Sequence, residues 1–283
     1  ILVVGAVPVW AVETATQNDI AISIFNEAHL KACEDVYNRT GIKPKVHVKI
    51  DTGMNRIGVR AEEAVEFINE VQNARYLDFQ GVFTHLAAAE EFEPTREQFN
   101  CWNDIISQID TKGLLLHIQN TAGTFAYNVE SNMVRVGISL YGLYPDLPTG
   151  VNKPKLKQIM SLKGRITNIH ELRAGESVSY GHSYTAYETT RIATIPIGYA
   201  DGIRRCYKGD VVIVGKRCPI VGNICMDSLM VDVTDLDNVC VGLDVYIWDN
   251  DIITVDEVAF KSNQINYEVI STISDRVPRV FIL

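Results

Sequence analysis

The chain has 283 residues, 47% hydrophobic and 22% charged, which are the proportions of a globular protein rather than of a disordered one. Its formal net charge of −9 argues against nucleic acid or an anionic membrane surface as the main partner. No apolar run approaches the roughly 20 residues that a membrane-spanning helix needs, so we expect no membrane segment in this chain.

The first half of the chain alternates short apolar runs with helical patterns. The opening run ILVVG predicts a buried strand, since it is β-branched and is followed by turn-forming Gly and Pro. Further strands are expected at IAISIF (20–25), VHVKIDTG (46–53), FQGVFTHLA (79–87), LLLHIQNTA (114–122) and MVRVGISLYGL (133–143).

Helices are expected between these strands. In AEEAVEFINEVQ (61–72) the apolar residues keep helical spacing, and acidic residues occupy the other face. Another helix is expected to begin at Thr95, which has capping-box spacing to Gln98. Strands that alternate with helices predict a parallel sheet, and the six strands compare with the eight of a (β/α)8 barrel. We therefore predict a TIM-like α/β barrel domain at 1–148 with six of its eight strands.

The pattern changes after the Pro- and Gly-rich stretch at 145–154. Short strands follow one another with Gly, Asp and Asn turns between them and hardly any helix until about residue 254. They lie at 163–172, 191–200, 210–215, 218–224, 228–235 and 244–249. This predicts an all-β C-terminal domain of sandwich or barrel type at 149–283. The six cysteines include no CxxC pair, so we expect no metal site, and reduced thiols in a cytoplasmic protein.

Three stretches hold residues that could carry chemistry. In VHVKIDTGMNRIGVR, alternation places His47, Lys49 and Asp51 on one face of a strand, and Arg56 follows the turn at its carboxyl end. Active sites of barrel enzymes lie at that end. The alternative interpretation is an ordinary strand end with a solvated arginine.

The second stretch, MVRVGISLYGLYP, has Arg135 inside an apolar strand, where arginine requires fixed partners. Gly137 allows a backbone N–H to approach a phosphate, and Asn120 and Thr121 in HIQNTAG offer further donors. Turn chemistry alone is the competing explanation. The third stretch comprises SVSYGHSY, IPIGYADG and GNICMDSLMVD, with Tyr180 and Tyr199 at turns. Either tyrosine alone is best explained by packing and one hydrogen bond.

Six motifs in this order, KIDTGMNRIGV, RVGISLYGLYP, VSYG, IPIGYADG, ICMD and RVPRV, resemble the alanine racemase family. The resemblance runs from about residue 46 to the end of the chain, and the opening strand fits it as well. It implies a barrel that binds pyridoxal 5′-phosphate (PLP), a C-terminal β domain, and a homodimer with shared active sites. The opening strand ILVVG matches about the third strand of the family's barrel, so the resemblance implies that the barrel lacks its first two strands in this chain. It also extends to the serine/alanine racemase domains of glycopeptide resistance, which follow a transmembrane region.

The resemblance implies a role for each matching residue. Tyr180 matches a catalytic base that reaches the partner subunit's site, and Arg135 matches the arginine at the pyridine nitrogen of PLP. Thr121 stands where the family usually has Ser, and phosphate binding is expected from Asn120, Thr121, Tyr199 and the backbone of Gly137 and Ile138. His85 matches a histidine near the cofactor ring. Arg56, Met226 and Asp227 match positions that hold the substrate carboxylate, and Lys49 matches a lysine that is carbamylated in many members.

Two departures from the family pattern bear on function. The family's cofactor lysine lies in a K-A-x-A-Y-G-type motif on the first barrel strand, and no such motif occurs here. We expect the chain to be a fragment of a longer protein rather than a truncated reading frame. Asp275 stands before RVPRV, where the family often has Tyr, near the substrate side chain and the cofactor phosphate. A polar residue there resembles the serine/alanine racemases.

The predicted function is interconversion of L- and D-alanine by two-base transfer of the α-proton, which supplies D-amino acid for cell-wall peptidoglycan. The alternatives are a serine racemase of the glycopeptide-resistance type and an inactive chain that lacks the cofactor lysine. A related barrel decarboxylase is disfavoured by the order VSYG, GYADG and CMD. The expected location is the cytoplasm, either as a free protein or as the cytoplasmic domain of a membrane-anchored one.

Overall fold

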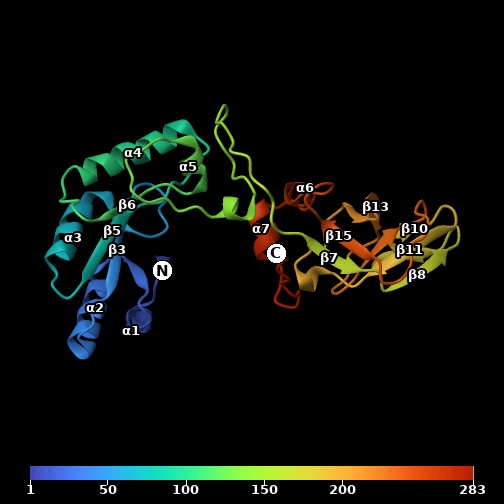
Figure 1. Cartoon of the computed structure of the whole chain (residues 1–283), viewed down its shortest axis with the longest axis horizontal. Helices are drawn as coiled ribbons and strands as arrows, with labels where there is room; N and C mark the ends of the chain where they lie inside the picture. Colours follow the sequence, from blue (N-terminus) through green and yellow to red (C-terminus); the bar gives the residue numbers. More distant parts are fainter. Residues whose placement is uncertain (283) are drawn as a thin grey trace. The chain divides into compact units, whose positions relative to one another are not determined.

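The computed structural model describes residues 1–282, which form two compact units (Figure 1). The N-terminal unit comprises Ile1–Leu140 and Tyr144–Lys155, and the C-terminal unit comprises Tyr141–Leu143 and the residues from Leu156 onward. The domain limits expected from the sequence, 1–148 and 149–283, stay a prediction. Within the described residues, no helix combines the length and the apolar character needed to cross a membrane.

A parallel sheet forms the centre of the N-terminal unit. Its strands are β1 (Leu2–Ala6), β2 (Ala21–Ile24), β3 (Lys45–Asp51), β5 (Asp78–Phe83) and β6 (Leu115–His117), and they lie side by side in chain order. The two-residue strand β4 (Val59–Arg60) also pairs with the end of β3. All the pairs are parallel, as the alternation of strands and helices predicted.

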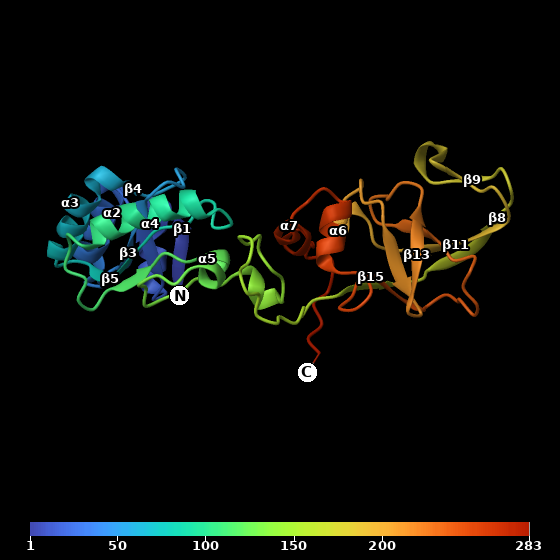
Figure 2. The ribbon, with the colours of Figure 1, turned by 90° about the horizontal axis from the view of Figure 1, so that it is seen from above.

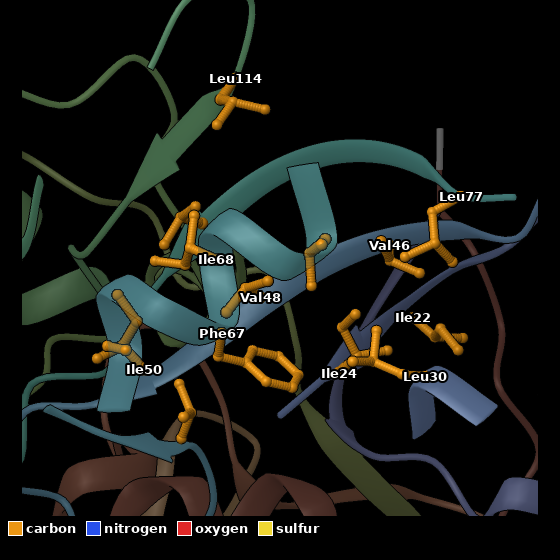
Figure 3. Packing of buried hydrophobic residues seen from close by; sticks show 14 of the residues in the cluster. Ile22, Ile24, Leu30, Val46, Val48, Ile50, Phe67, Ile68, Leu77 and Leu114 are labelled. Atoms are coloured by element: carbon orange, nitrogen blue, oxygen red, sulfur yellow. The ribbon is translucent and has the colours of Figure 1, made fainter. Parts of the chain in front are cut away.

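The central strand β3 is buried on both of its faces. Val46, Val48 and Ile50 belong to the hydrophobic core, where Figure 3 shows them beside residues of α3 and β2. The alternate residues His47, Lys49 and Asp51 are also buried, with at most 8% of their surface exposed. Because successive side chains of a strand point to opposite faces, these polar groups share the face that the apolar residues leave.

The helices of the N-terminal unit are α1 (Val12–Gln17), α2 (Glu27–Thr40), α3 (Ala61–Asn73), α4 (Phe92–Ile106) and α5 (Thr121–Ala126), with the short 3₁₀ turns η1 (Val9–Ala11) and η2 (Ile138–Tyr141). The predicted helix at 61–72 is confirmed, and it buries Ala64, Ile68 and Val71. The predicted capping box is wrong. Helix α4 begins at Phe92, so Thr95 and Gln98 lie inside it, where both are buried and bond to the loop before the helix.

Two predicted strands differ from the structure. Strand β1 exists, but it is exposed rather than buried, because it lies at the edge of the sheet and pairs only with β2. The predicted strand at 133–143 is irregular and ends in η2. The Asn132 amide and the Arg135 guanidinium bind backbone groups of β6 and of the residues on either side of it. These side-chain hydrogen bonds replace the regular backbone ladder of a strand pair.

The C-terminal unit contains an antiparallel sheet, as predicted. Its strands are β7 (Leu162–Arg165), β8 (Asn168–Leu172), β11 (Thr190–Ile195), β12 (Asp210–Ile213), β13 (Lys216–Val221), β14 (Leu229–Asp232) and β15 (Asp244–Trp248), in the order β7-β15-β12-β13-β14-β11-β8. Strands β7 and β8 stand at opposite ends of this order although they are consecutive in the chain. Ile166 and Thr167 between them bond to Leu243 and Thr194, so one segment joins both ends of the sheet.

A small hairpin of β9 (Ser177–Val178) and β10 (Tyr184–Thr185) extends from the C-terminal sheet near β8 (Figure 2). The 3₁₀ turn η3 (Tyr180–His182) forms its tip, and a second turn, η4 (Tyr199–Asp201), follows β11. Two helices, α6 (Val255–Lys261) and α7 (Asn266–Ser271), contact each other after the last strand, which agrees with the predicted lack of helix before residue 254.

The turn between β12 and β13 contains an unfavourable residue. Val214 and Gly215 both have positive φ, 49° and 72°, in a two-residue hairpin loop of the kind that favours Asn-Gly. A β-branched residue is strained in this conformation. We expect Val214→Asn to raise the free energy of unfolding by about 1 kcal/mol, measured by urea titration. Val214→Ala keeps the Cβ and should give a smaller gain, and an unchanged or lower stability of Val214→Asn would contradict the prediction.

Candidate active site

The parallel strands bring several predicted site residues to one edge of the N-terminal sheet. Strands β3, β5 and β6 end at Asp51, Phe83 and His117. The loops after β3 and β5 hold Arg56 and His85, and the loop after β6 leads to Thr121 at the start of α5. Since carboxyl ends of parallel strands lie at the same edge, these loops are neighbours. Arg135 joins them, because its backbone N–H bonds to the carbonyl of Gln119 at 3.0 Å.

The Arg135 guanidinium is the most connected group at this edge. It donates to His117 Nδ1 at 2.7 Å, to the His117 carbonyl at 2.8 Å, to the Thr84 carbonyl at 2.6 Å and to the Ile118 carbonyl at 3.3 Å. It also lies over the Phe83 ring, 5.2 Å from its centroid. Burial lowers the pKa of Arg135 to about 10, so it stays protonated at neutral pH.

Two buried histidines continue the hydrogen-bond network that begins at Arg135. His117 Nε2 lies 2.9 Å from His47 Nδ1, and Gly81 makes room for the His47 ring because a Cβ there would meet Nδ1 at 2.6 Å. Burial, with the charge of Arg135, lowers the pKa of His117 to about 2 and that of His47 to about 4. Both rings are therefore neutral. Because a guanidinium only donates, His117 Nδ1 accepts and its Nε2–H donates to His47.

Burial and nearby positive charge also lower the pKa values of Lys49 and His85 at this edge. Burial lowers the pKa of Lys49 to about 8, and its Nζ donates to the Ile50 carbonyl at 2.7 Å. Burial and the charges of Arg135, Arg56 and Lys49 lower the pKa of His85 to about 4. Arg56 itself is exposed, on the loop after β3. An edge with this excess of positive charge suits an anionic ligand.

The buried histidines predict a loss of stability in acid. Unfolded histidines titrate near pH 6.5, whereas His47 and His117 stay neutral in the folded chain down to about pH 4 and below. Between these pH values the unfolded state binds more protons, so the free energy of unfolding falls as the pH falls. We expect a slope approaching about 3 kcal/mol per pH unit from the two residues together, measured by urea titration.

A variant at His47 separates the contribution of the histidines to this pH dependence from the contribution of the carboxylates. His47→Asn keeps an acceptor for the His117 N–H but cannot titrate. The slope between pH 6.5 and 4 should fall by about half of the histidine contribution in this variant. An identical slope in both proteins would show that His47 is not held neutral.

Four of the predicted phosphate residues form a compact group in the N-terminal unit, and the fifth, Tyr199, lies in the C-terminal unit. Thr121 is 4% exposed, and its hydroxyl oxygen accepts the Gly137 N–H at 2.9 Å, so the hydroxyl proton remains available to an acceptor. Ile138 follows, and it is buried. Asn120 is different, because its side chain caps α5 by accepting the Gly123 N–H at 2.9 Å. The Oδ1 atom of Asn120 therefore already has a hydrogen-bond partner within the protein.

Gln98, which the sequence suggested only as a capping residue, joins two of the loops. Its Oε1 accepts the Ala87 N–H at 2.8 Å, which orients the amide so that Nε2 donates to Thr52 Oγ1 at 3.0 Å and to the His85 carbonyl at 3.1 Å. Thr52 Oγ1 in turn lies 2.8 Å from Thr84 Oγ1. Helix α4 therefore fixes the ends of β3 and β5 relative to each other.

The C-terminal unit assembles a second group of predicted residues. The N–H groups of Tyr199 and Ala200 donate to the carbonyls of Cys225 and Met226 at 3.0 and 2.8 Å. Gly198 permits this approach, since a Cβ there would lie 2.4 Å from the Cys225 carbonyl oxygen. Asp227 follows on the same loop, and both it and Met226 are exposed.

Asp201 connects this group with the segment that contains Asp275. Its carboxylate accepts the Gly198 N–H at 2.9 Å and lies 3.6 Å from Arg276 Nε, and its carbonyl accepts the Ser274 N–H at 3.1 Å. The carboxylate is nearly buried, with 7% of its side chain exposed. The motifs GYADG, CMD and DRVPR are thus joined, and the Asp275 side chain is exposed beside them.

Tyr180 lies at the tip of the β9–β10 hairpin with 72% of its surface exposed. Its backbone carbonyl accepts from Asn223 Nδ2 at 2.9 Å, which connects the tip with the loop that holds Met226 and Asp227. Tyr180 therefore belongs to the C-terminal group.

The predicted site residues thus form two groups. One comprises Lys49, Arg56, His85, Asn120, Thr121, Arg135, Gly137 and Ile138 of the N-terminal unit. The other comprises Tyr180, Tyr199, Met226, Asp227 and Asp275 of the C-terminal unit. Alternation along the strand singled out His47 beside Lys49 but gave it no role, and no sequence pattern identified His117, Gln98, Asn223 or Asp201 as site residues. These four bond across long sequence separations that no local pattern shows.

Known proteins share both units. Residues 1–145 match the family profile described as "Alanine racemase, N-terminal domain", and residues 159–281 match "Alanine racemase, C-terminal domain". An alanine racemase of Desulfovibrio desulfuricans is 37% identical over 292 residues, which cover 100% of this chain and 78% of the relative. One from Staphylococcus saprophyticus is 39% identical over 290 residues, covering 99% and 75%.

Solved structures agree with these matches. The alanine racemase from Bacillus anthracis with bound L-Ala-P has a TM-score of 0.89 at 34% identity, covering 100% of this chain and 76% of that one. The alanine racemase of Clostridium difficile 630 has a TM-score of 0.92 at 37% identity, covering 98% and 74%. The predicted fold class, a barrel-type α/β domain followed by an all-β domain, is confirmed. The chain belongs to the alanine racemase family.

Proposed function

We propose that this chain is the racemase portion of a PLP-dependent enzyme that interconverts L- and D-alanine and supplies D-alanine for peptidoglycan. The family uses PLP. The observation that favours this function is the Arg135 guanidinium, held by four bonds at the end of a parallel sheet beside Thr121. The six cysteines are all unpaired, in keeping with a cytoplasmic location.

The residues at this edge fit PLP. Arginine has five N–H donors, and the structure gives acceptors within the described residues to four of them. The donor left over is Nε–H, which suits an acceptor such as a pyridine nitrogen. Thr121 and the backbone of Ile138 would hold the phosphate, and Gly137, whose N–H donates to Thr121 Oγ1, would orient that hydroxyl. His85 would lie near the ring. PLP, when bound, withdraws electrons from Cα and makes the α-proton acidic.

The protein's own groups would then direct the proton. Racemisation needs an acid and a base on opposite sides of Cα, and Tyr180 would serve on one side. Arg56, Met226 and Asp227 would hold the substrate carboxylate. Arg135 would donate a hydrogen bond without giving up its proton, because guanidinium remains charged at neutral pH. Tyrosine has a reference pKa near 10, so it accepts a proton only where nearby cations stabilise the phenolate.

Lys49 is proposed to be carbamylated, as its match within the family implies. Carbamylation by CO2 needs a neutral amine, and the lowered pKa of about 8 gives this buried lysine a larger neutral fraction at pH 7 than an exposed one. A carbamate would place negative charge among Arg56, Arg135 and His85. Intact-protein mass spectrometry in 13CO2 should show a labelled adduct in the wild type and none in Lys49→Met.

We further propose a homodimer in which Tyr180 of one copy serves the N-terminal unit of the other. Coexpression of Arg135→Met with Tyr180→Phe tests this arrangement. Half of the dimers would be mixed, and each mixed dimer would have one intact site of two, which gives about a quarter of the wild-type activity. If each copy served only itself, the mixture would show no activity above that of the separate variants.

The function itself is tested by treating the protein from its complete reading frame with PLP and borohydride, which fixes the cofactor to the lysine that holds it. Peptide mapping then identifies that lysine. A label on a lysine outside residues 1–283, with racemisation of alanine, would agree with the proposal. Absence of any label would favour the alternative that the chain is an inactive remnant.

Serine is the second candidate substrate. Asp275 is an exposed polar residue beside the Tyr199 and Met226 motifs, where the family resemblance led us to expect an effect on the side-chain pocket. The ratio of kcat/KM for L-serine and L-alanine distinguishes the two candidates. A ratio above one would make the protein a serine racemase.

A further inference from the structure

We propose that Ser179 and Asn223 are positioning residues that fix the direction of Tyr180, an inference that rests on the base role proposed above. The Tyr180 side chain is 72% exposed, and the described residues provide no hydrogen-bond partner for its hydroxyl. Its direction is therefore set by the backbone at the tip of the hairpin. Three hydrogen bonds hold this backbone, and we call them the Ser179–Asn223 clamp.

The first two bonds of the clamp are reciprocal. Ser179 Oγ donates to the Asn223 carbonyl at 2.8 Å and accepts the Asn223 N–H at 2.9 Å. The third runs from Asn223 Nδ2 to the Tyr180 carbonyl at 2.9 Å. Together they tie both residues of the Ser-Tyr pair to the loop before Met226. The expected base and the expected carboxylate-binding residues are thus held by one contact.

The backbone conformation of Ser179 is strained, which indicates that the clamp holds Ser179 in this conformation. Ser179 has φ 75° and ψ 169°, a region that is essentially restricted to glycine. A non-glycine residue persists there only where surrounding contacts impose the conformation. Gly222 contributes to the close approach, since it has φ 74° and a Cβ on it would lie 2.5 Å from Ser179 Cβ.

Three variants of the full chain distinguish an effect on the direction of Tyr180 from an effect on the stability of the protein. Ser179→Ala removes both Oγ bonds, and Asn223→Ala removes only the bond to Tyr180. Ser179→Gly also removes the Oγ bonds, but glycine adopts positive φ without strain, so the thermal midpoint should be kept or raised. Ser177→Ala is the control, because Ser177 Oγ bonds only to Thr185 Oγ1 across the same hairpin, at 2.9 Å.

The first readout does not depend on catalysis. Hydrogen exchange followed by mass spectrometry should show at least about tenfold faster exchange at 179–183 in the Ser179 variants, because two of the hydrogen bonds that hold this segment are lost. Asn223→Ala should give a smaller increase, and Ser177→Ala none. Unchanged exchange in both Ser179→Ala and Asn223→Ala would overturn the clamp.

The second readout is exchange of the alanine α-hydrogen in D2O, in the PLP-loaded protein. We expect kcat to fall about ten- to a hundredfold in Ser179→Gly, with KM within about twofold and the thermal midpoint kept or raised. If Tyr180→Phe impairs exchange but Ser179→Gly does not, the positioning role is wrong and the base role survives. If Tyr180→Phe itself has no effect, both roles are wrong.

Discussion

Replacing Tyr180 with phenylalanine is expected to lower racemisation at least about a hundredfold in one or both directions, because a positioned general base contributes about 10²–10⁴-fold. The substitution removes only the hydroxyl. Since 72% of this side chain is exposed, stability should hardly change. The rates are measured from L- and from D-alanine, by α-hydrogen exchange in D2O.

Tyr187→Phe is the control for this substitution. Tyr187 follows the same hairpin and is 94% exposed, so it matches Tyr180 in residue type, neighbourhood and solvation. It should retain the wild-type rates. Unchanged rates in both directions for Tyr180→Phe would remove this residue from the mechanism.

Arg135→Met is expected to lower the free energy of unfolding by about 3–5 kcal/mol, because it leaves several buried acceptors without a donor, at a cost of about 1–3 kcal/mol each. Without the guanidinium, the carbonyls of Thr84, His117 and Ile118 and the Nδ1 of His117 lose their donor. The loss of positive charge should also raise the pKa of His47 and His117, because Arg135 lowers both. Urea titration and NMR titration of the histidines measure the two effects.

Arg165→Met is the matched control. Arg165 pairs with Asp244 at 3.1 Å, but its side chain is 71% exposed. Exposed ion pairs contribute about 0–1 kcal/mol, so this variant should lose little stability. Arg135→Lys should resemble Arg135→Met more than the wild type, since an ammonium cannot reproduce the planar fork. Wild-type stability in Arg135→Lys would mean that charge alone suffices.

The parts of the fold that depend on local alternation could be predicted. Short strands separated by Gly and Asn turns identified the antiparallel sheet, and helical spacing at 61–72 identified α3. The strand expected at 133–143 is irregular, because Asn132 and Arg135 bind the backbone of β6 and of the residues on either side of it through their side chains. Hydrophobicity alone cannot distinguish such a segment from a strand. The exposure of β1 similarly follows from its edge position, which composition does not show.

Individual residues of the candidate site could be predicted from the sequence, but the hydrogen bonds that connect them could not. Arg135 was identified because an arginine among apolar residues needs partners, yet the partners lie far away in sequence, such as Thr84. Gln98 shows the same limit. Its spacing to Thr95 fits a capping box, but burial beside His85 gave it a different set of bonds. The groups that bond to a side chain depend on which distant segments approach it in the folded chain. Residue spacing along the sequence indicates only local geometry.

The order of strands in the C-terminal unit has a consequence for synthesis on the ribosome. Strand β7 pairs with β15, and the contact between Lys163 and Asp244 spans 81 residues. At a synthesis rate of 5–20 residues per second, β15 would be made roughly 4 to 16 s after β7. During that interval β7 and the β15-facing edge of β12 present unpaired backbone groups. Nascent chains that stop before β15 should therefore depend on chaperones, and a pause in translation there would extend the period in which they can aggregate.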